Sequence, residues 1–442
     1  MTSAQHTVTQ SVHDAGVDLI RGQDPQVAAI LDAEAERQAT TIELIASENH
    51  ASPAVMAAAG SCMTNKYAEG YPSARYYGGC VHHDAVEQLA IDRATELFGC
   101  NYDNVQPHSG AQANADAYIA ILKPGDTFAS LVLADGGHLS HGLKVNMSGK
   151  WFNPVHYPLH YDENHPEFEQ IDYDKVAEVC REHKPKVLMC GYSAYPRVID
   201  FKRFRAIADE VGALLFADIA HIAGLVAGGA HPSPFPHAHL VTTTTHKSLR
   251  GPRGGLILTN EEDMIKKLNR AVFPGTQGGP LMHIVTAKAI AFGEALKPEF
   301  REYVQQIVTN AKALAAALVE HGYRITSGGT DNHVMLVDLR TKDAELTGAD
   351  AEVWLEQGGL ICNKNGVPQD PRPPKVTSGI RLGASAVTTR GFGESEMRQV
   401  AAFIDRVLTA GLKGEAELNT EALAVREEVR QLCDGFPLPG HD

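Results

Sequence analysis

Short apolar runs in the middle of the chain constrain its fold more than any other feature of the sequence. Helical or loop segments separate these runs, and a further run occurs later, at residues 334–338. Strands that alternate with helices are typical of a mostly parallel sheet covered by helices. We therefore predict an α/β protein whose main sheet includes residues 127–133, 186–190, 213–217, 240–244 and 255–258.

The chain has 442 residues, which is long for a single hydrophobic core, so we expect two domains and an arm. A long helical region is predicted for residues 281–318, and we place the domain boundary within it, near Pro298. An amphipathic helix is also predicted after Asp84, ending near Gly99, because apolar residues recur there at helical spacing: Val86, Leu89, Ala90, Ala94 and Leu97. The expected units are an N-terminal arm at residues 1–40, a large domain at 41–298 and a smaller C-terminal α/β domain at 299–442.

The composition narrows the functional class and the compartment. A formal net charge of −15 argues against a nucleic-acid surface. Residues 1–40 hold no positively charged start and no continuous apolar stretch, so neither a signal peptide nor a membrane span is expected. The seven cysteines are odd in number and form no Cys-x-x-Cys pair, which suits reduced thiols. We predict a cytoplasmic protein.

Lys247 follows a β-branched run at residues 241–245 and precedes a glycine-rich turn at residues 251–255. A lysine held at a strand end among apolar and hydroxyl groups can lose its proton and attack a carbonyl, as Schiff-base lysines do. The alternative is a lysine whose ammonium reaches solvent, as in most lysines. Lys247 is our candidate for a covalent cofactor anchor.

Asp218 ends the preceding apolar run, one strand and helix before Lys247. Open α/β sheets bind ligands at the carboxyl ends of their strands, so both side chains are expected to face one crevice. Pyridoxal phosphate requires such a pair, because a lysine binds its aldehyde and an acidic group keeps its ring nitrogen protonated. Taken alone, Asp218 could equally cap a helix.

Two further segments suit this cofactor. Ser109 and Gly110 begin a helical run that extends to Leu122, and the backbone N–H groups at a helix start can bind a phosphate. His138 lies in a glycine-rich loop from which its ring could stack on the pyridine ring of the cofactor. Its spacing to His141 also suits a metal pair, but the sequence offers no third ligand at zinc-like spacing, so we predict no metal site.

With these residues in place, the chain resembles the serine hydroxymethyltransferase family from Ile42 to Phe392, with further similarity to the C-terminus. The resemblance implies the type I fold of pyridoxal-phosphate enzymes, with a mostly parallel seven-stranded sheet between helices. It also implies a homodimer in which each active site takes residues from both subunits, with a tetramer left open. The segments that carry it are the Ser109, His138 and Lys247 segments and residues 43–49, 64–72, 75–79, 218–224, 275–280, 363–365 and 378–381.

The resemblance assigns roles to matching positions of this chain. Those implied to hold the cofactor within one chain are Ser109, Gly110, Ala111, His138, Ser193, Asp218, His221, His246 and Lys247. Gly279 of the partner subunit is implied to complete the cofactor site. Those implied to act in catalysis are Lys247, Glu69, Tyr77, His221 and Thr244. Those implied to bind the amino acid are Ser47, Tyr67, Glu69, Tyr77 and Arg381. Those implied to bind a folate are Glu69, Tyr76, Leu133, Gly137, Leu139 and Asn365.

The implied reaction moves a one-carbon unit reversibly between serine and tetrahydrofolate. Three departures from the usual family pattern leave the substrate open: residues 383–386 read Gly-Ala-Ser-Ala in place of Gly-Thr-Pro-Ala, Asp135 precedes the His138 loop, and Tyr157-Pro158 replaces Tyr-Gly. An enzyme acting on α-methylserine and giving D-alanine is therefore an alternative. Two others are a folate-independent aldolase for β-hydroxy amino acids and a catalytically silent protein of the same fold, against which the intact Lys247, Asp218 and Arg381 argue.

Overall fold

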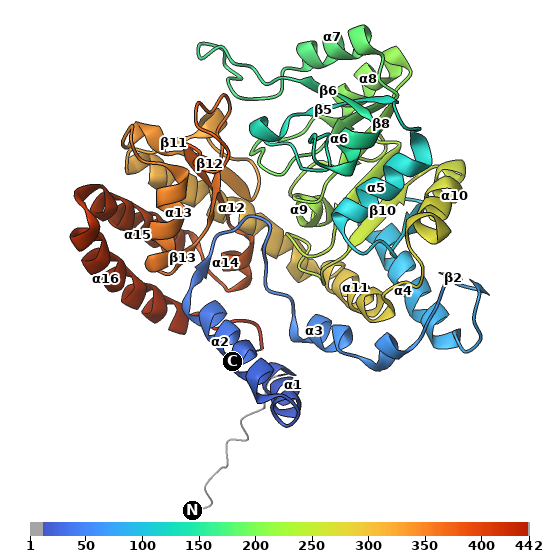
Figure 1. Cartoon of the computed structure of the whole chain (residues 1–442), viewed down its shortest axis with the longest axis horizontal. Coiled ribbons are helices and arrows are strands. Elements are labelled where there is room, and N and C mark those ends of the chain that lie inside the picture. Colours follow the sequence, from blue (N-terminus) through green and yellow to red (C-terminus); the bar gives the residue numbers. More distant parts are fainter. Residues whose placement is uncertain (1–11, 441–442) are drawn as a thin grey trace, which may run out of the picture.

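The computed structural model describes residues 12–440, and a seven-stranded sheet forms the centre of its larger part (Figure 1). The strand order is β4-β10-β9-β8-β7-β5-β6, and β10 is antiparallel to both of its neighbours while the strands from β9 to β6 are parallel. The strands are β4 (Tyr102–Asn104), β5 (Thr127–Leu131), β6 (Asn153–Tyr157), β7 (Val187–Cys190), β8 (Leu214–Asp218), β9 (Leu240–Thr244) and β10 (Gly255–Thr259). The predicted α/β class and the mostly parallel seven-stranded sheet are confirmed.

All five predicted apolar runs contain a strand of this sheet, whereas β4 and β6 were not found from the sequence. β4 has three residues, two of them polar. β6 reads Asn-Pro-Val-His-Tyr and lies at the sheet edge, where a proline costs no hydrogen bond to a further strand. Neither strand has the continuous apolar pattern of a central parallel strand.

Helices cover both faces of the large sheet, and alternate residues of a strand enter different cores. Leu215 packs into the core on the side of α7 and α8, and Phe216 packs into the core on the side of α5 and α10. Alternation of this kind is what a central strand covered on both faces requires. The helices of this part are α4 (Val81–Phe98), α5 (Gly110–Ile121), α6 (Met147–Trp151), α7 (Tyr173–His183), α8 (Phe201–Val211), α9 (Ala223–Ala227), α10 (Glu262–Arg270) and α11 (Met282–Ala295).

A second, antiparallel sheet of four strands lies in the C-terminal part, in the order β11-β12-β15-β14. Its register places Leu336 opposite Arg381. The strands are β11 (Arg324–Ile325), β12 (Val334–Asp338), β14 (Asn363–Asn365) and β15 (Gly379–Gly383), and the helices around them are α12 (Pro298–Glu320), α13 (Gly348–Gln357), α14 (Ser385–Thr389), α15 (Glu394–Lys413) and α16 (Glu415–Asp434).

The single long helix predicted for residues 281–318 is wrong, because the structure has two helices there. α11 ends at Ala295 and α12 begins at Pro298, with Lys297 in an extended conformation (φ −76°, ψ 151°). A proline disfavours the helical conformation of the residue before it and lacks an N–H, so it suits the first position of a new helix. α11 packs against α4, and α12 packs against α15.

The N-terminal segment joins the two parts. β1 (Ile42–Glu43) pairs in parallel with β13 (Leu360–Ile361), and α3 (Pro53–Ala59) packs against α11. Before them lie α1 (Val12–Arg21) and α2 (Pro25–Thr40), which cover the described portion of the predicted arm. The remaining elements are the hairpin β2 (Gly70–Tyr71) and β3 (Ala74–Arg75) and the short helical turns Cys62–Asn65, Leu133–Asp135, Ala271–Thr276, Thr326–Gly328 and Leu339–Thr341.

The helix predicted after Asp84 begins earlier, at Val81, and ends as expected before Gly99, whose φ of 63° suits a glycine. Its buried face differs in part from the predicted apolar stripe. Leu89 is 42% exposed, whereas Glu87 is buried and its carboxylate accepts a hydrogen bond from Arg75 at 2.5 Å. An internal ion pair therefore replaces part of the apolar stripe that spacing alone predicted.

No helix in the described part of the chain is both long and apolar enough to cross a membrane. All seven cysteines are free, and six of them are buried.

Candidate active site

A cavity of about 620 Å³ lies at the carboxyl ends of the strands of the large sheet. Arg381 reaches this cavity from β15 of the four-stranded sheet. Most of the residues predicted for the site line this cavity: Ser47, Ser109, Gly110, Ala111, Leu133, His138, Leu139, Ser193, Asp218, His221, Thr244, His246, Lys247, Asn365 and Arg381. The predicted crevice at the strand ends is therefore present.

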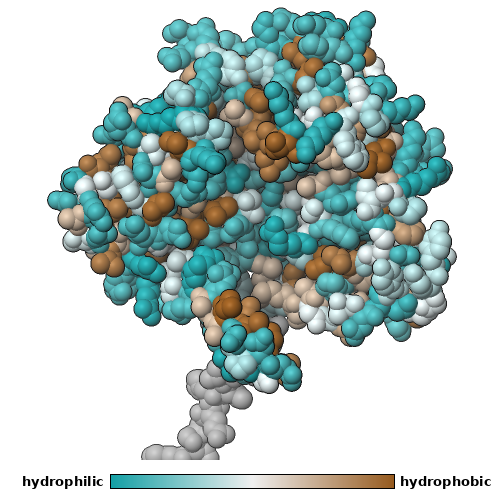
Figure 2. Space-filling view, viewed as in Figure 1, coloured by the Kyte–Doolittle hydropathy of each residue, from teal (hydrophilic) through white to brown (hydrophobic). Residues whose placement is uncertain are grey.

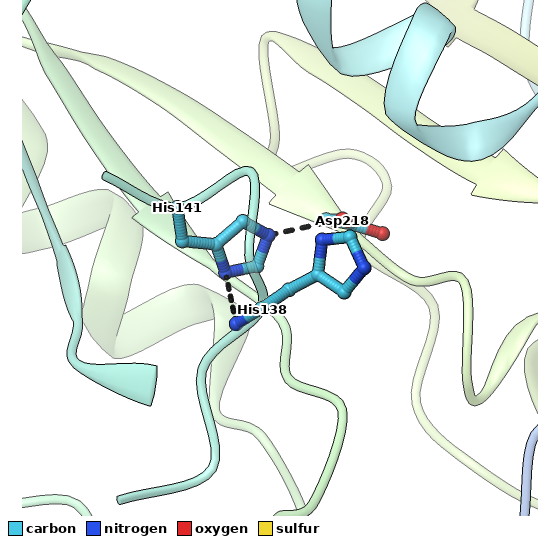
Figure 3. Close-up of side chains that lie close together, drawn as sticks. All are labelled: His138, His141 and Asp218. Carbon is cyan, nitrogen blue, oxygen red and sulfur yellow. Dashed lines mark hydrogen bonds and ion pairs between the residues drawn. The ribbon is translucent and has the colours of Figure 1, made fainter. Parts of the chain in front are cut away.

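Asp218 ends β8 and is held by three hydrogen bonds. Its Oδ2 lies 3.0 Å from His141 Nε2 (Figure 3). The same Oδ2 accepts from Asn114 Nδ2 at 2.8 Å, and Oδ1 accepts from the N–H of Ala220 at 3.0 Å. Burial acts to raise the pKa of Asp218, but the interactions with His141 and the hydrogen bond from Asn114 outweigh it and hold the pKa below its usual range. Asp218 is thus an ionised carboxylate inside the cavity.

Lys247 follows β9, and a tight turn presents it to the cavity. The N–H of Arg250 donates to the carbonyl of Lys247 at 2.9 Å, and Asn49 Nδ2 donates to the same carbonyl at 2.9 Å. The side chain is only 8% exposed, and burial lowers its pKa to about 8. The amine therefore carries a larger neutral fraction near pH 7 than an ordinary lysine, as a nucleophile requires.

The loop that carries His138 requires glycine. A Cβ on Gly137 would lie 2.3 Å from the carbonyl oxygen of Leu131, and Gly136 has a φ of 107°. His138 Nδ1 lies 2.7 Å from Ser140 Oγ, and burial lowers the pKa of His138 to about 4. A neutral ring therefore faces the cavity. Gly137 itself supports the loop and does not line the cavity.

The histidines of this loop also meet a third group that the sequence did not indicate. Ligand atoms of His138, His141 and Asp218 lie within 4.8 Å of one another, so the fold brings a carboxylate to the histidine pair that spacing in the sequence did not indicate. The fold brings Asp218 from another strand, which spacing cannot reveal. Because Asp218 already accepts from His141 and Asn114, this group forms a hydrogen-bond network, and the absence of a metal site stays a prediction.

A second group of possible metal donors lies on the segment after β6, away from the cavity. It consists of His160, His165 and Glu167. The two imidazole rings stack with centroids 4.0 Å apart, and His165 Nδ1 accepts the N–H of Glu167 at 3.1 Å. His160 Nε2 lies 3.5 Å from Glu167 Oε2, and His160 Nδ1 lies 3.4 Å from Asp172 Oδ2, so these side chains already interact with one another.

The start of α5 fits the phosphate of the expected cofactor. Ser109 Oγ caps the helix by accepting from the N–H of Gln112 at 3.1 Å. A Cβ on Gly110 would lie 2.6 Å from Thr244 Cγ2, so glycine lets the helix start approach β9 closely. His246 Nδ1 is buried without a hydrogen-bond partner in the described chain, and burial lowers the pKa of His246 to about 3. Open helix N–H groups and an unpaired buried nitrogen are groups that a bound cofactor would satisfy.

Arg381 is a cation without a carboxylate partner among residues 12–440. Its Nη1 donates to the carbonyl of Ser193 at 2.9 Å, and its Nε donates to Asn363 Oδ1 at 3.2 Å. Burial lowers the pKa of Arg381 to about 10, so it stays charged at neutral pH. A buried guanidinium with unused donors is suited to bind a carboxylate ligand.

Five predicted residues form a separate group outside the cavity: Tyr67, Glu69, Tyr76, Tyr77 and Gly279. Tyr77 OH donates to Glu69 Oε2 at 3.4 Å, and the rings of Tyr67 and Tyr77 meet edge to face at 5.5 Å. A Cβ on Gly279 would lie 2.9 Å from Tyr67 Cε1. The three tyrosines are 59%, 73% and 46% exposed in chain order, so this group faces outward in the single chain.

Six lining residues were not singled out from the sequence: Glu48, His141, Tyr192, Ala220, Arg253 and Asn363. Glu48 and Asn363 lie within the segments that carry the resemblance, and Arg253 lies in the turn after Lys247. Their positions within or beside these segments could have identified these three residues as candidates for the site. His141 was considered only as a metal ligand, and its contact with Asp218 had no signal in the sequence.

A buried lysine and an ionised aspartate on neighbouring parallel strands, beside an open helix start, define a pyridoxal-phosphate enzyme of the type I fold. A family model described as serine hydroxymethyltransferase matches residues 20–404. The chain belongs to the serine hydroxymethyltransferase family.

Individual members of the family are similar over nearly the whole chain. A serine hydroxymethyltransferase of Erythrobacter litoralis is 58% identical over 442 residues, which cover 99% of this chain and 100% of that protein. One of Methylorubrum populi is 58% identical over 417 residues, 94% of each chain. One of Novosphingobium aromaticivorans is 56% identical over 444 residues, 99% of each chain. The family assignment thus extends over both sheets.

Proposed function

We propose that this enzyme transfers a one-carbon unit reversibly between serine and tetrahydrofolate, giving glycine and 5,10-methylenetetrahydrofolate. The observation that carries the proposal is that three side chains face one cavity: Asp218 at the end of β8, Lys247 just after β9 and Arg381 in β15. The names of the similar proteins support serine as the amino acid.

The cofactor, pyridoxal phosphate, supplies an electron sink for the bonds at the Cα of the amino acid. Lys247 is proposed to bind its aldehyde carbon, and Asp218 to accept the hydrogen bond of its protonated ring nitrogen. The neutral ring of His138 is suited to stack on the pyridine. The remaining proposed cofactor contacts in this chain are Ser109, Gly110, Ala111, Ser193, His221 and His246.

Arg381 is proposed to clamp the carboxylate of the amino acid. A guanidinium binds a carboxylate through two parallel hydrogen bonds, which fixes the direction of the bond to be broken. Ser47 lines the same cavity and is proposed to contact the substrate. Thr244 ends β9 beside Lys247, its Oγ1 donates to the carbonyl of Ala220 at 3.3 Å, and we keep it as a proposed catalytic residue.

We propose that the chain acts as a homodimer. The outward-facing group of one copy, made up of Tyr67, Glu69, Tyr76, Tyr77 and Gly279, is proposed to complete the cavity of the other copy. The support is that Glu69, Tyr67 and Tyr77 do not line the cavity of their own chain, although their roles require it. Gly279 belongs to the same outward-facing group. A tetramer of two such dimers stays open.

Exposed apolar residues on the arm suit this assembly. The face of the molecule in Figure 2 is mostly hydrophilic, with a compact hydrophobic patch over α1 and α2 at its base. Leu19 and Ile30 on these helices are 78% and 68% exposed. Apolar patches of this kind mark protein contacts, so the arm is proposed to pack against the second copy.

The proposed folate site lies at the mouth of the cavity. Leu133 and Leu139 line it and are 39% and 49% exposed, which gives an apolar rim for a flat ring. Asn365 adds an amide on the opposite sheet. Glu69 and Tyr76 belong to the outward-facing group and are proposed to reach the folate from the second copy, while Gly137 shapes the loop behind the rim.

The domain limits and the compartment remain part of the proposal. We place the large domain at residues 41–298 and the small domain at residues 299–442, because Pro298 begins the helix that packs against α15. We place the enzyme in the cytoplasm, which free cysteines suit.

The test is a comparison of L-serine and α-methyl-L-serine, each with and without tetrahydrofolate. The proposal expects folate-dependent turnover and a higher kcat/KM for L-serine. A higher kcat/KM for α-methylserine would overturn the choice of substrate, and turnover that does not need folate would overturn the transfer reaction.

The departures from the family pattern lie behind the cavity. Residues 383–386, Asp135 and the pair Tyr157-Pro158 do not line it. Asp135 accepts a hydrogen bond from Tyr161, and the N–H of Ala384 donates to the carbonyl of His333 at 3.0 Å. These residues therefore give the α-methylserine alternative no direct contact with a substrate.

A further inference from the structure

Lys288 is a buried lysine in α11 that the proposed mechanism does not use. It is 1% exposed and lines no part of the cavity. Its ammonium donates to three backbone carbonyls: Val105 at 2.6 Å, Pro107 at 3.1 Å and Gly255 at 2.7 Å. An ammonium has three donors, so all of its hydrogen-bonding capacity is used on the backbone.

The three carbonyls belong to the segment that leads into the phosphate site and to the strand beside it. Val105 and Pro107 lie between β4 and Ser109, where α5 is capped. Gly255 begins β10, and its N–H donates to the carbonyl of Pro107 at 2.9 Å. Lys288 thus binds both the segment before Ser109 and the first residue of β10, and so holds this segment against the central sheet.

Gln277 holds the same segment from another side. Its Oε1 accepts from the N–H of His108 at 3.0 Å, and its Nε2 donates to the carbonyl of Gln106 at 3.1 Å. Each of the four residues before Ser109 therefore has a backbone group bound by Lys288 or Gln277. The backbone of Gly255 also approaches this segment closely, since a Cβ on Gly255 would lie 2.2 Å from the carbonyl oxygen of Ser109.

The charge of Lys288 is not neutralised by a direct ion pair. Within residues 12–440 its ammonium makes no salt bridge, and Glu87 instead bonds to Arg75 and Gln106. Burial lowers the pKa of Lys288, and the carboxyls of Glu87 and Asp103 act in the opposite direction.

We infer that Lys288 is a positioning residue for the cofactor phosphate: by binding three backbone carbonyls it holds the segment before Ser109 so that the first N–H groups of α5 face the phosphate. This inference rests on the proposed cofactor. It assigns no contact between Lys288 and the cofactor itself.

The test compares two ligands that differ only in the phosphate. Pyridoxal phosphate and pyridoxal are titrated into cofactor-free protein in phosphate-free buffer, and their dissociation constants are measured from the visible absorption. Lys288→Met keeps an unbranched side chain that extends as far as Cε and removes the ammonium, with its donors and charge. Exposed Lys312 provides the control Lys312→Met.

The inference expects Lys288→Met to weaken pyridoxal phosphate about 10- to 100-fold, as the loss of groups that orient ligand contacts does, and to leave pyridoxal within about twofold. Lys312→Met should change neither constant. Because Lys288→Met removes a hydrogen bond from each of three backbone carbonyls and can fail to fold, Gln277→Met is measured in parallel. The same selective loss is expected, since Gln277 binds the same segment.

Three results would overturn the inference. Equal weakening of both ligands would mean a general structural role, and unchanged binding of pyridoxal phosphate would mean that the segment needs no tether. If Lys288→Met does not fold, an unselective effect of Gln277→Met overturns it. A parent protein that binds neither ligand would instead refute the proposed cofactor, so the two failures are distinguishable.

Discussion

His141 Nε2 and Asp218 Oδ2 lie 3.0 Å apart, and the other nitrogen of His141 fixes the direction of this hydrogen bond. His141 Nδ1 accepts the N–H of His138 at 3.2 Å, so Nε2 carries the proton and donates to the carboxylate. His141 thereby keeps Asp218 ionised and connects it through hydrogen bonds to the loop that carries His138. It acts on the cofactor only through its neighbours.

Replacing His141 should therefore impair the electron sink more than cofactor binding. A hydrogen bond to a charged group contributes about 1.5–3 kcal/mol, so His141→Phe should lower kcat about 10- to 100-fold and shift the visible band of the bound cofactor. The measurements are steady-state kinetics and absorption spectra, with exposed His183→Phe as the control. An unchanged spectrum together with an unchanged kcat would refute this role.

Replacing Lys247 by Ala should abolish multiple turnover, because the variant lacks the amine that binds the cofactor and releases the product. The fold should survive, since the side chain faces a cavity and makes no side-chain hydrogen bond with the described residues. Turnover, the visible spectrum and far-UV circular dichroism check this, with Lys312→Ala as the control. Ordinary turnover in Lys247→Ala would show that the anchor lies elsewhere.

Arg381→Ala should remove the clamp for the substrate carboxylate. Truncating one partner of a buried charge pair costs about 2–5 kcal/mol, so kcat/KM for serine should fall about 30- to 5,000-fold. The dissociation constant of pyridoxal phosphate should change little, because Arg381 is assigned to the substrate. Arg398, which is exposed on α15, provides the control Arg398→Ala. The assignment fails if kcat/KM does not change.

The free energy of unfolding should depend on pH because buried histidines such as His333 are protonated in the unfolded chain before they are protonated in the folded chain. Burial lowers the pKa of His333 from 6.5 to about 3, so between these values the unfolded chain binds a proton that the folded chain does not. The free energy of unfolding should therefore fall as the pH drops below 6.5, by up to about 1.4 kcal/mol per pH unit for each such group. Urea unfolding at pH 7.5 and 5.5 measures the loss, which should be smaller in His333→Gln. An equal loss in both proteins would contradict the assignment to His333.

Local sequence patterns predicted the strands whose own residues form a continuous apolar run. The apolar runs at β8 and β9 marked central strands, and Asp218 and Lys247 followed as residues at neighbouring strand ends. β6 had no such signal, because an edge strand tolerates Pro154 and polar residues. The break between α11 and α12 was marked only by Pro298, which apolar spacing on both sides obscured.

Contacts between distant segments could not be predicted from the residues alone. Asp218 meets His141 and Asn114 because the end of β8, the loop that carries His141 and helix α5 converge, and Arg381 reaches the cavity only because the small sheet packs beside it. The resemblance supplied Arg381 and Glu69, but it could not place Glu69 relative to the cavity of its own chain. That placement depends on how the hairpin after α3 folds.

Glu69 should govern proton transfer in the folate-dependent reaction. Glu69→Gln keeps the size and hydrogen bonding of the side chain but removes its titratable group, and loss of a positioned acid or base typically costs about 10²- to 10⁴-fold. A bulky β-hydroxy amino acid such as phenylserine can lose its aldehyde without folate. Folate-dependent turnover of serine should therefore fall much further than phenylserine cleavage when both are assayed on the same preparation.

Tyr77 offers the matched comparison, because its hydroxyl donates to Glu69 at 3.4 Å. Tyr77→Phe removes this contact and leaves the carboxylate, so it should reduce serine turnover less than Glu69→Gln does. If Glu69→Gln reduces serine turnover and phenylserine cleavage equally, Glu69 has a general binding or structural role. Mixing Glu69→Gln chains with Lys247→Ala chains then tests the dimer. If each copy's Glu69 serves the other cavity, every mixed dimer contains one intact site and the mixture recovers activity, whereas sites built within one chain recover none.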